Sequence, residues 1–332
     1  MNIYDIARLA GVSIATVSRV VNNSPKVSER TKEKVRAVME AENYTPNVFA
    51  RGLGINSMKT IGIICPDVSD DYMAKAVACL EKGLRKYGYD CILYCSGYTY
   101  ERRAQAVNSL LKKKIDALIL VGSNYVGNQK ACDVEYLIHA AKEIPLILIN
   151  GYVDCEGIYC MLADNFTAVY DAVNRLIKAG KKEILFLYDS DSYSAKEKMR
   201  GYENAMKDCG ILPRENLKVF VQNKVEKVRE ALNEKKNLKF DAVVATDDGL
   251  AIGAMKYVRE HGKRIPEEIS VVGYNDLELA VCCEPELTSI DSRSEDLCNQ
   301  AVEKLMKILE GEETEQKEIL SCRLKERSTT KF

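Results

Sequence analysis

From residue 59 onward the chain alternates short apolar runs with amphipathic stretches of helical spacing, and this alternation limits the possible fold most strongly. The apolar runs occupy residues 60–65, 91–95, 117–121, 146–150, 184–188, 242–245 and 270–274, and helical spacing occupies residues 72–86, 164–179, 194–208 and 247–261. Near-continuous apolar strands that alternate with helices are typical of parallel sheets buried on both faces. The series is too long for one sheet, so we predict an α/β core of two doubly wound subdomains with a cleft between them.

The first 44 residues contain no strand-like stretch and are expected to be all-α. Asn2 can cap a first helix with Asp5 at its third position. Gly11 is expected to end this helix, because glycine enters the left-handed conformation without steric strain. The apolar stripe of the helix is predicted at Ile6, Leu9 and Ala10.

Two further helices are predicted in this segment. Ser13 can cap the second and Ser28 the third, and the stretch from Asn22 to Pro25 separates them. The side chains expected to face inward are Val17, Val20, Val21, Val35, Val38 and Met39. Three short helices with a tight glycine-containing turn between the first two predict a helix-turn-helix head.

Charge is distributed unevenly along the chain. Residues 1–60 carry nine Lys and Arg against five acidic residues, whereas the remainder carries 39 against 44, for an overall net charge of −1. A positive head on a negative body suits a polyanionic partner at one end of the molecule, and double-stranded DNA is the partner that the helix-turn-helix pattern indicates.

The N-terminus and the cysteines indicate the compartment. The start MNIYDIARLAGV has no apolar core of a secretory signal, and no run of about 18 apolar residues predicts a membrane span. The twelve cysteines fall mostly in apolar runs, as Cys65, Cys91 and Cys160 do, and are expected to be reduced and buried. We therefore expect a cytoplasmic protein without a membrane partner.

The segment IYDIARLAGVSIATVSRVVNNSPKVSERTKEKVRAVMEAENYTPN (residues 3–47), followed by VFARGLG, resembles the head of the LacI/GalR family of bacterial transcription regulators. The similarity extends with gaps to LKERST near the end. It implies a helix-turn-helix head at 1–45, a hinge at 46–58 and an effector-binding core of the periplasmic-binding-protein type at 59–332. Within that core it implies an N-subdomain of about 60–160 and 292–319 and a C-subdomain of about 161–291 and 320–332.

The resemblance implies that the second helix enters the major groove of operator DNA. Base-reading positions fall on Ile14, Ala15 and Arg19, of which the apolar pair suits thymine methyl groups and Arg19 suits guanine O6 and N7. The Ile-Ala pair is similar to that of galactose-type and catabolite-control members. The alternative for Ile14 is a place in the core of the head. Phosphate contacts are expected from Ser13, Thr16, Ser18 and Asn22.

Residues 46–53 resemble the family's hinge, which forms a short helix on DNA. Such a segment is too short to be a stable helix alone in water, so it would order over the minor groove when two copies pack together. Leu53 matches the wedge that enters a base step and kinks the duplex, and Arg51 would reach phosphate or the groove floor. Asn47 and Ala50 complete the expected DNA contacts. The alternative is a plain linker.

The resemblance also places effector-binding residues along the cleft. In the loop after the first strand, Asp71 would accept ligand hydroxyls and Tyr72 would stack on a ring, although a proline usual in the family is missing there. Lys198 stands where the family generally has Arg, and it offers a point charge in place of a planar fork. The remaining candidates are Ser123, Asn150, Asp247 and Asn275. At the last two positions the family's amide and carboxylate have changed places. The alternative for each is a solvated loop residue near a strand end, but such ends are where open α/β sheets bind ligands.

Nothing in the sequence indicates an enzyme or a cofactor. His139 and His261 are the two histidines and neither lies at metal-ligand spacing, so no metal site is expected. No phosphate-binding glycine loop and no serine nucleophile elbow occur, and the pair Asp247-Asp248 has no matched catalytic partner. No catalytic residue is therefore assigned.

These observations together predict a homodimeric repressor of carbohydrate-utilisation genes. Two heads would bind a pseudo-palindromic operator with half-sites about one helical turn apart. A sugar or polyol in the cleft would bind the two subdomain orientations unequally and so switch the hinge. Three alternatives remain open: control by a phosphocarrier protein or a nucleoside, a sugar-binding protein without a DNA role, and a sugar-metabolising enzyme on the same scaffold.

Overall fold

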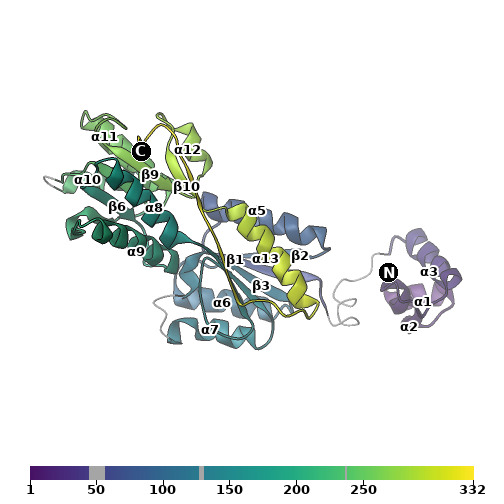
Figure 1. The fold of residues 1–332 in the computed structure, drawn as a ribbon. Helices are drawn as coiled ribbons and strands as arrows, with labels where there is room; N and C mark the ends of the chain where they lie inside the picture. Colours follow the sequence, from purple (N-terminus) through teal and green to yellow (C-terminus); the bar gives the residue numbers. More distant parts are fainter. Residues whose placement is uncertain (45–56, 127–130, 236–237) are drawn as a thin grey trace.

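A computed structural model of the chain describes residues 1–44, 57–126, 131–235 and 238–332. It contains a three-helix head and an α/β core of two subdomains, each built on its own six-stranded sheet (Figure 1). Asn47, Ala50, Arg51 and Leu53, the predicted hinge contacts, lie outside the described residues.

The head consists of α1 (Ile3–Ala10), α2 (Ile14–Val21) and α3 (Glu29–Ala41). The predicted caps are confirmed. Asn2 and Asp5 form a capping box at α1, and Gly11 ends that helix with φ of 59°. Ser13 and Ser28 each accept a backbone hydrogen bond at the start of α2 and α3. Local capping chemistry therefore sets the start of all three helices and the end of α1.

The core of the head is made of small and branched apolar side chains. Its buried members are Ile6, Ala7, Ala10, Val17, Val20, Val27 and Val35. The prediction for Leu9 is wrong, because its side chain is 49% exposed and Ala7 is buried instead. Ile6 and Ala10 lie one turn apart, so the stripe continues through Ala7, and Leu9 falls on the flank of the helix.

The N-subdomain sheet has the strand order β11-β5-β4-β3-β1-β2, and all of its neighbouring strands are parallel. The strands are β1 (Thr60–Cys65), β2 (Asp90–Cys95), β3 (Ala117–Val121), β4 (Leu146–Ile149), β5 (Ile158–Ala163) and β11 (Lys317–Leu320). Its helices are α5 (Asp71–Lys86), α6 (Tyr100–Leu111), α7 (Ala131–Ala141) and α13 (Ser294–Leu309), with a 3-10 turn, η1, at Ser123–Val126. Residues of α5 and α13 pack on one face of the sheet, and residues of α6 and α7 pack on the other. The sheet is therefore doubly wound, as predicted.

The C-subdomain repeats this plan with the strand order β12-β10-β9-β8-β6-β7. The strands are β6 (Ile184–Tyr188), β7 (Lys218–Phe220), β8 (Ala242–Ala245), β9 (Ser270–Tyr274), β10 (Thr288–Asp291) and β12 (Arg323–Lys325). Its helices are α8 (Asn165–Lys178), α9 (Tyr193–Asp208), α10 (Val225–Glu234), α11 (Asp248–Glu260) and α12 (Glu278–Cys282), with a 3-10 turn, η2, at Glu215–Leu217. The edge strand β12 runs antiparallel to β10, and the other neighbours are parallel.

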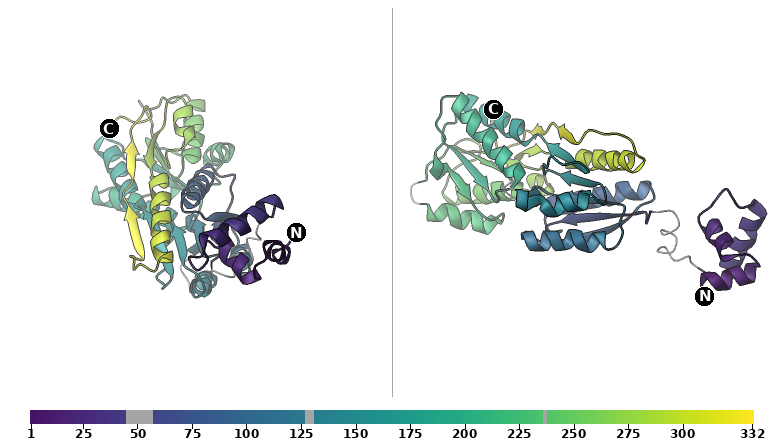
Figure 2. Two further views of the ribbon diagram at one scale, coloured as in Figure 1. Left: turned by 90° about the vertical axis from the view of Figure 1, so that its right-hand side faces the viewer. Right: turned by 90° about the horizontal axis from the view of Figure 1, so that it is seen from below.

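The chain crosses between the subdomains at three short connections. They join β5 to α8, β10 to α13 and β11 to β12. The last of them lies in the yellow stretch that runs along the molecule in Figures 1 and 2. In the N-subdomain sheet, β5 extends to Ala163 and β11 to Leu320, which is slightly beyond the predicted subdomain boundaries at about 160 and 319. Three short connections hold the two subdomains together yet leave their relative orientation adjustable.

The cysteines are free thiols wherever the structure describes them. Cys65 and Cys160 are buried as expected, and Cys91 is partly buried. Cys95, Cys209 and Cys282 are exposed, contrary to the expectation that the cysteines lie inside. An apolar run in the sequence therefore does not guarantee burial for each residue within it, because edge strands, short helices and helix ends such as that of α9 remain partly in water.

Candidate functional site

The outward face of α2 carries the predicted base-reading residues. Ile14 is 42% exposed, and Ala15 and Arg19 are exposed as well. Val17 and Val20, on the opposite face, pack into the core of the head with exposed fractions of 0% and 3%. The alternative of a core role for Ile14 is therefore wrong. The side chain of Ile14 is therefore accessible to a partner surface.

The predicted phosphate contacts lie around both ends of the same helix. Ser13 Oγ accepts a hydrogen bond from the backbone N–H of Thr16 at 3.1 Å, and the two hydroxyls lie 2.9 Å apart. Ser18 is partly buried, and Asn22 forms the C-cap with a buried Oδ1 that has no partner among the described residues. The first turn of α2 thus presents hydroxyls and backbone N–H groups, which is the chemistry that a phosphate accepts.

A cleft of about 690 Å³ lies between the two subdomains at the ends of their strands. The first wall comes from the segments that follow β1, β3 and β4, and the second from those that follow β6, β8 and β9. Among the predicted effector residues, Tyr72, Ser123, Asn150, Lys198, Asp247 and Asn275 line it. Their placement follows from the parallel sheets, because the carboxyl ends of parallel strands meet at one edge.

Asp71 does not line the cleft, contrary to its predicted placement. Its side chain is exposed in the first turn of α5, and the neighbouring Asp70 lines the cleft instead. Asp70 is the N-cap of α5 and accepts a hydrogen bond from the backbone N–H of Met73 at 3.0 Å. The N-cap residue lies just before the helix and faces the strand end, whereas the next residue has already turned outward with the helix.

Tyr72 and Asn150 form a fixed corner of the first wall. The Nδ2 of Asn150 donates to the hydroxyl of Tyr72 at 2.7 Å, and its Oδ1 accepts from the backbone N–H of Ala163 at 2.9 Å. Tyr72 is only 8% exposed, and burial raises the pKa of its hydroxyl. Its ring therefore belongs mainly to the wall, while Tyr98, which is 59% exposed, adds an aromatic side chain with more accessible surface to the cleft lining.

Lys198 reaches the cleft from α9 as a buried cation. Its Nζ donates to the backbone oxygen of Thr246 at 2.9 Å and lies 3.5 Å from the centroid of the Tyr274 ring. Burial lowers the pKa of Lys198 to about 8, against the opposing effect of Asp247 and Asp189. The ammonium group of Lys198 is thus held within the wall as a point charge, and the protein already accepts one of its hydrogen bonds.

Asp247 and Asn275, the exchanged amide and carboxylate, are hydrogen-bonded to each other. Asn275 Nδ2 donates to Asp247 Oδ2 at 3.0 Å, and the other carboxylate oxygen accepts from Asn223 Nδ2 and the Gly249 backbone N–H, each at 2.8 Å. Asn275 Oδ1 also accepts from Ser292 Oγ at 3.3 Å. Both carboxylate oxygens of Asp247 therefore accept hydrogen bonds from the protein itself, and these bonds fix the orientation of the side chain.

Among the described residues, a side-chain contact joins the two walls of the cleft directly. The hydroxyls of Ser123, from the N-subdomain, and Ser194, from α9 of the C-subdomain, lie 2.8 Å apart. Ser194 was not predicted from the sequence. A ligand that enters between the walls competes with contacts of this kind, so the cleft can couple ligand binding to subdomain orientation.

The acidic character of the cleft was not predicted. Asp67, Asp70 and Asp189 line it besides Asp247. Burial raises the pKa of Asp70 and Asp189, and the charge of Asp247 raises both further. Asp189 follows β6 directly, so a search for polar residues after each apolar run would have found it.

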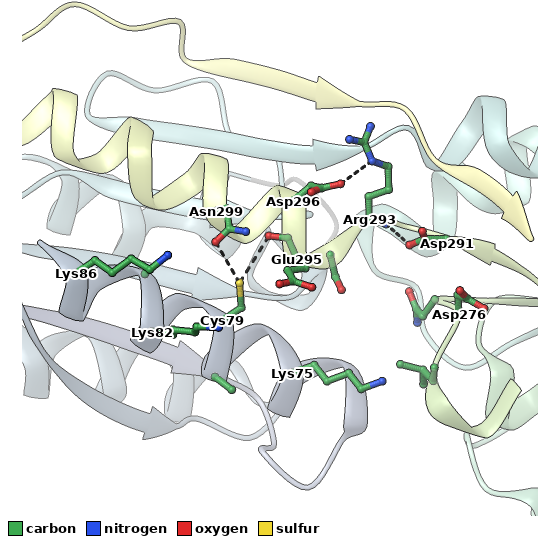
Figure 3. Close-up of a pocket in the computed structure, with 15 residues that line it drawn as sticks. Lys75, Cys79, Lys82, Lys86, Asp276, Asp291, Arg293, Glu295, Asp296 and Asn299 are labelled. Carbon is green, nitrogen blue, oxygen red and sulfur yellow. Dashed lines mark hydrogen bonds and ion pairs between the residues drawn. The ribbon is translucent and has the colours of Figure 1, made fainter. Parts of the chain in front are cut away.

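A second hollow of about 620 Å³ lies along α5 and α13 (Figure 3). Lys75, Lys82 and Lys86 of α5 line one side, and Cys79 between them bonds to Asn299 Oδ1 at 3.5 Å. The other side carries Arg293 and the acidic side chains of Asp276, Asp291, Glu295 and Asp296. Positive and negative groups balance here, so this hollow presents no field of one sign to a small charged ligand.

The described residues contain no cluster of three or more His, Cys, Asp or Glu side chains that could hold a metal ion. Within the same part of the chain, no helix combines the length and the apolar character that a membrane crossing requires.

Comparison with known proteins agrees with this geometry in both parts of the molecule. Residues 58–328 match the family described as "Periplasmic binding proteins and sugar binding domain of LacI family", and residues 2–47 match "Bacterial regulatory proteins, lacI family". The chain belongs to the LacI family. This LacI-family protein is 48% identical to an HTH-type transcriptional regulator of Lachnoclostridium phytofermentans over 100% of both chains.

Other relatives support the same assignment. The catabolite control protein A of Streptococcus mutans is 32% identical over 100% of this chain and 98% of its own. The GalR regulator of Escherichia coli is 32% identical over 91% of this chain and 87% of its own. These relatives are transcriptional regulators, so the chain is a DNA-binding transcriptional regulator and not an enzyme, as the sequence predicted.

Solved structures show the fold of the full chain. The Lac repressor dimer bound to operator and the anti-inducer ONPF superimposes with a TM-score of 0.87, at 26% identity over 99% of this chain and 98% of that one. A complex of the regulator CelR with cellobiose superimposes with a TM-score of 0.72 at 24% identity, over 99% of each chain. The predicted head and two parallel-sheet subdomains are therefore confirmed.

Proposed function

We propose that this LacI-family regulator is a homodimeric repressor of carbohydrate-utilisation genes that binds a pseudo-palindromic operator and responds to a sugar-like effector. The observation that carries the proposal is the pairing of two surfaces in one chain. One is the exposed Ile14–Arg19 face of α2, and the other is the polar cleft between the subdomains. A surface suited to DNA and a cleft suited to a small molecule are thus present in the same chain.

The DNA-reading part of the proposal follows from the geometry of α2. Ile14 and Ala15 lie at the start of the helix, where a recognition helix meets base edges, and Arg19 follows about one turn later. Apolar side chains at the first two positions favour thymine methyl groups, and Arg19 favours guanine. Asn47, Ala50, Arg51 and Leu53 remain the predicted contacts of the hinge with the minor groove.

The switching part rests on the construction of the cleft. Its two walls belong to different sheets that are joined by three connections, and the Ser123–Ser194 contact crosses between them. A ligand that bonds to both walls binds one subdomain orientation more tightly than another, which is the condition for a switch. A complex of CelR with cellobiose and the Lac repressor bound to ONPG show that proteins of this fold accept sugars and glycosides.

The dimeric part rests on exposed apolar groups along the core. Leu279 and Val281 of α12 are 41% and 43% exposed, and Leu93 of the edge strand β2 is 42% exposed. Large apolar side chains at an open sheet edge and on a short helix favour burial against a second copy. Sedimentation of Val281→Glu, compared with the wild type, should show a larger monomer fraction; an unchanged dimer would exclude this helix from the interface.

Operator selection by the full-length protein tests the DNA-reading proposal. A randomised pool should yield a palindromic site whose affinity falls steeply with salt. Arg19→Ala should then lose discrimination at one base pair of each half-site by about 1–3 kcal/mol. Arg30→Ala, an exposed arginine of α3, is the matched control and should keep the base preference. Equal losses on all duplexes for Arg19→Ala would assign it to phosphate instead.

The second candidate is control by a phosphocarrier protein, which would dock outside the cleft. The lysines of α5 in the second hollow favour an anionic partner, but the acidic side chains opposite them oppose it. A thermal-shift comparison of sugars, polyols, nucleosides and a phosphocarrier protein separates the candidates. Stabilisation by the carrier protein alone would replace the proposed cleft effector.

A further inference from the structure

The ligand cleft carries more negative than positive charge. Four aspartates line it, Asp67, Asp70, Asp189 and Asp247, against two lysines, Lys198 and Lys224. The aspartates come from both walls, because the first two follow β1 and the others follow β6 and β8. A ligand between the walls therefore meets carboxylates on both sides, and this field repels phosphate or carboxylate groups.

The two lysines offset this negative field only in part, although the charge of Lys198 acts on Asp189. Lys198 is 6% exposed, donates to the backbone oxygen of Thr246 and lies over the Tyr274 ring. Lys224 is exposed at the start of α10, where solvent and salt screen its charge. The positive charge inside the cleft is thus held within the wall.

The aspartates differ in how many hydrogen bonds their carboxylates accept from the protein. Asp247 accepts hydrogen bonds from Asn223, Asn275 and the Gly249 backbone. In contrast, no other residue that the structure describes donates a hydrogen bond to the Asp189 carboxylate. Burial and the charge of Asp247 raise the pKa of Asp189, Lys198 opposes them, and Asp70 adds a smaller repulsion from across the cleft. Asp189 is therefore a partly exposed acceptor of the cleft wall, and no side chain among the described residues donates a hydrogen bond to it.

A second polar group in the same wall also lacks a partner. Thr246 lines the cleft beside Asp247 and is 6% exposed, and its hydroxyl has no hydrogen-bond partner within the described residues. Buried hydroxyls are normally paired, so an unpaired one in a ligand cleft indicates a group that the ligand supplies. The hydroxyl is independent of the acidic cluster, and both observations call for a polar ligand with hydrogen-bond donors.

We infer that the effector is a polyhydroxylated amine such as an amino sugar, whose ammonium group lies between Asp70 and Asp189. The ammonium supplies positive charge between the two carboxylates and donors for the acceptor positions that the protein leaves open. Its hydroxyls meet Thr246 and the amides of the cleft. This inference rests on the proposed function, since it assigns a chemical class to the effector of the same cleft.

Matched ligand pairs test the inference on the full-length protein. Isothermal titration at neutral pH and low salt would compare glucosamine with glucose, galactosamine with galactose, and the β-1,4-linked glucosamine disaccharide with cellobiose. At least one amine should bind about tenfold more tightly than its neutral partner, and added salt should reduce the difference. Glucose 6-phosphate should not bind.

Variants in which asparagine replaces an aspartate test which carboxylate causes the preference for the amine. Asp189→Asn should bring the affinity for the amine to within about threefold of that for its neutral partner. Asp171→Asn removes the same charge from the exposed surface of α8 and should leave the preference unchanged. The melting temperature of each variant without ligand verifies that it is folded.

The outcomes separate this inference from the proposed function. If neutral sugars bind as tightly as the amines in every pair, or if glucose 6-phosphate binds, the inference is overturned and the sugar-responsive function stands. If no member of any pair binds, both fall. An unchanged preference in Asp189→Asn would also overturn the assignment of the ammonium to this carboxylate.

Discussion

Asp248 should make the stability of this regulator fall with rising pH, and Asp248→Asn should remove much of that dependence. The carboxylate is completely buried at the start of α11. It accepts hydrogen bonds from the Leu277 backbone N–H at 2.7 Å and from Ser289 Oγ at 2.6 Å. An asparagine can keep both contacts, because its oxygen accepts from Leu277 and its amide donates to Ser289.

The magnitude follows from the pKa. Burial raises the pKa of Asp248 from 3.8 to about 7, although its two hydrogen bonds lower it. Between these values the folded protein binds a proton that the unfolded chain has released, so the free energy of unfolding falls as pH rises. At 1.36 kcal/mol per unit, the resulting penalty is about 1.5 kcal/mol at pH 5 and about 4 kcal/mol at pH 8.

Urea unfolding at intervals between pH 5 and pH 8 measures this effect. The stability difference between Asp248→Asn and the wild type should shift in favour of the variant by about 2.5 kcal/mol across that range. Asp171→Asn is the matched control, because it removes an exposed carboxylate and should not reproduce the shift. A difference that stays constant with pH would show that Asp248 is ionised in the folded protein throughout, and would refute the reasoning.

Three further predictions concern packing, capping and the cleft. Gly201→Ala should lower the free energy of unfolding by about 2–3 kcal/mol in urea titrations, because a Cβ there would overlap the backbone oxygen of Phe166 in α8; normal stability would contradict the close packing of α8 and α9. Ser13→Ala and Asn2→Ala should each destabilise the head by about 1 kcal/mol through loss of a cap. Only Ser13→Ala should also weaken operator binding in a fluorescence-anisotropy titration. Equal operator affinities of the two variants would remove Ser13 from the phosphate contacts. Lys198→Met should change the thermal shift produced by the effector while circular dichroism stays native, because Lys198 joins Thr246 and Tyr274 in the cleft wall, and an unchanged shift would place the ligand elsewhere.

Much of the fold could be predicted because its signals are local. Caps at Asn2, Ser13 and Ser28 act within four residues of chain, and the buried strands β1, β3 and β8 are continuous apolar runs. The strands that were not predicted include β7, β11 and β12, which are short edge strands with exposed positions. Their pattern resembles that of loops, since a strand paired on one side needs few apolar residues.

The candidate site was predictable to the extent that its residues follow strands in the sequence. Asp247 and Asn275 follow β8 and β9, whereas Lys198 lies within α9; the resemblance to the family indicated all three, and all three line the cleft. Asp70 and Asp71 show the limit of this approach, because one residue decides whether a side chain faces the cleft or the solvent. That choice depends on where α5 begins, which the capping geometry of the folded loop determines.

The sequence alone predicted the three helices of the head, the alternation of strands and helices in the core and the family, since all three depend on side chains that are neighbours along the chain. Only the tertiary structure decided that Asp70 and Asp189, which are 119 positions apart in the sequence, act on one another across a cleft. It also decided that Lys198 is held within the wall by Thr246 and Tyr274. The physical reason is that burial and electrostatic repulsion depend on distances in space. Those distances are set by two sheets joined by three connections, and no local sequence pattern records them.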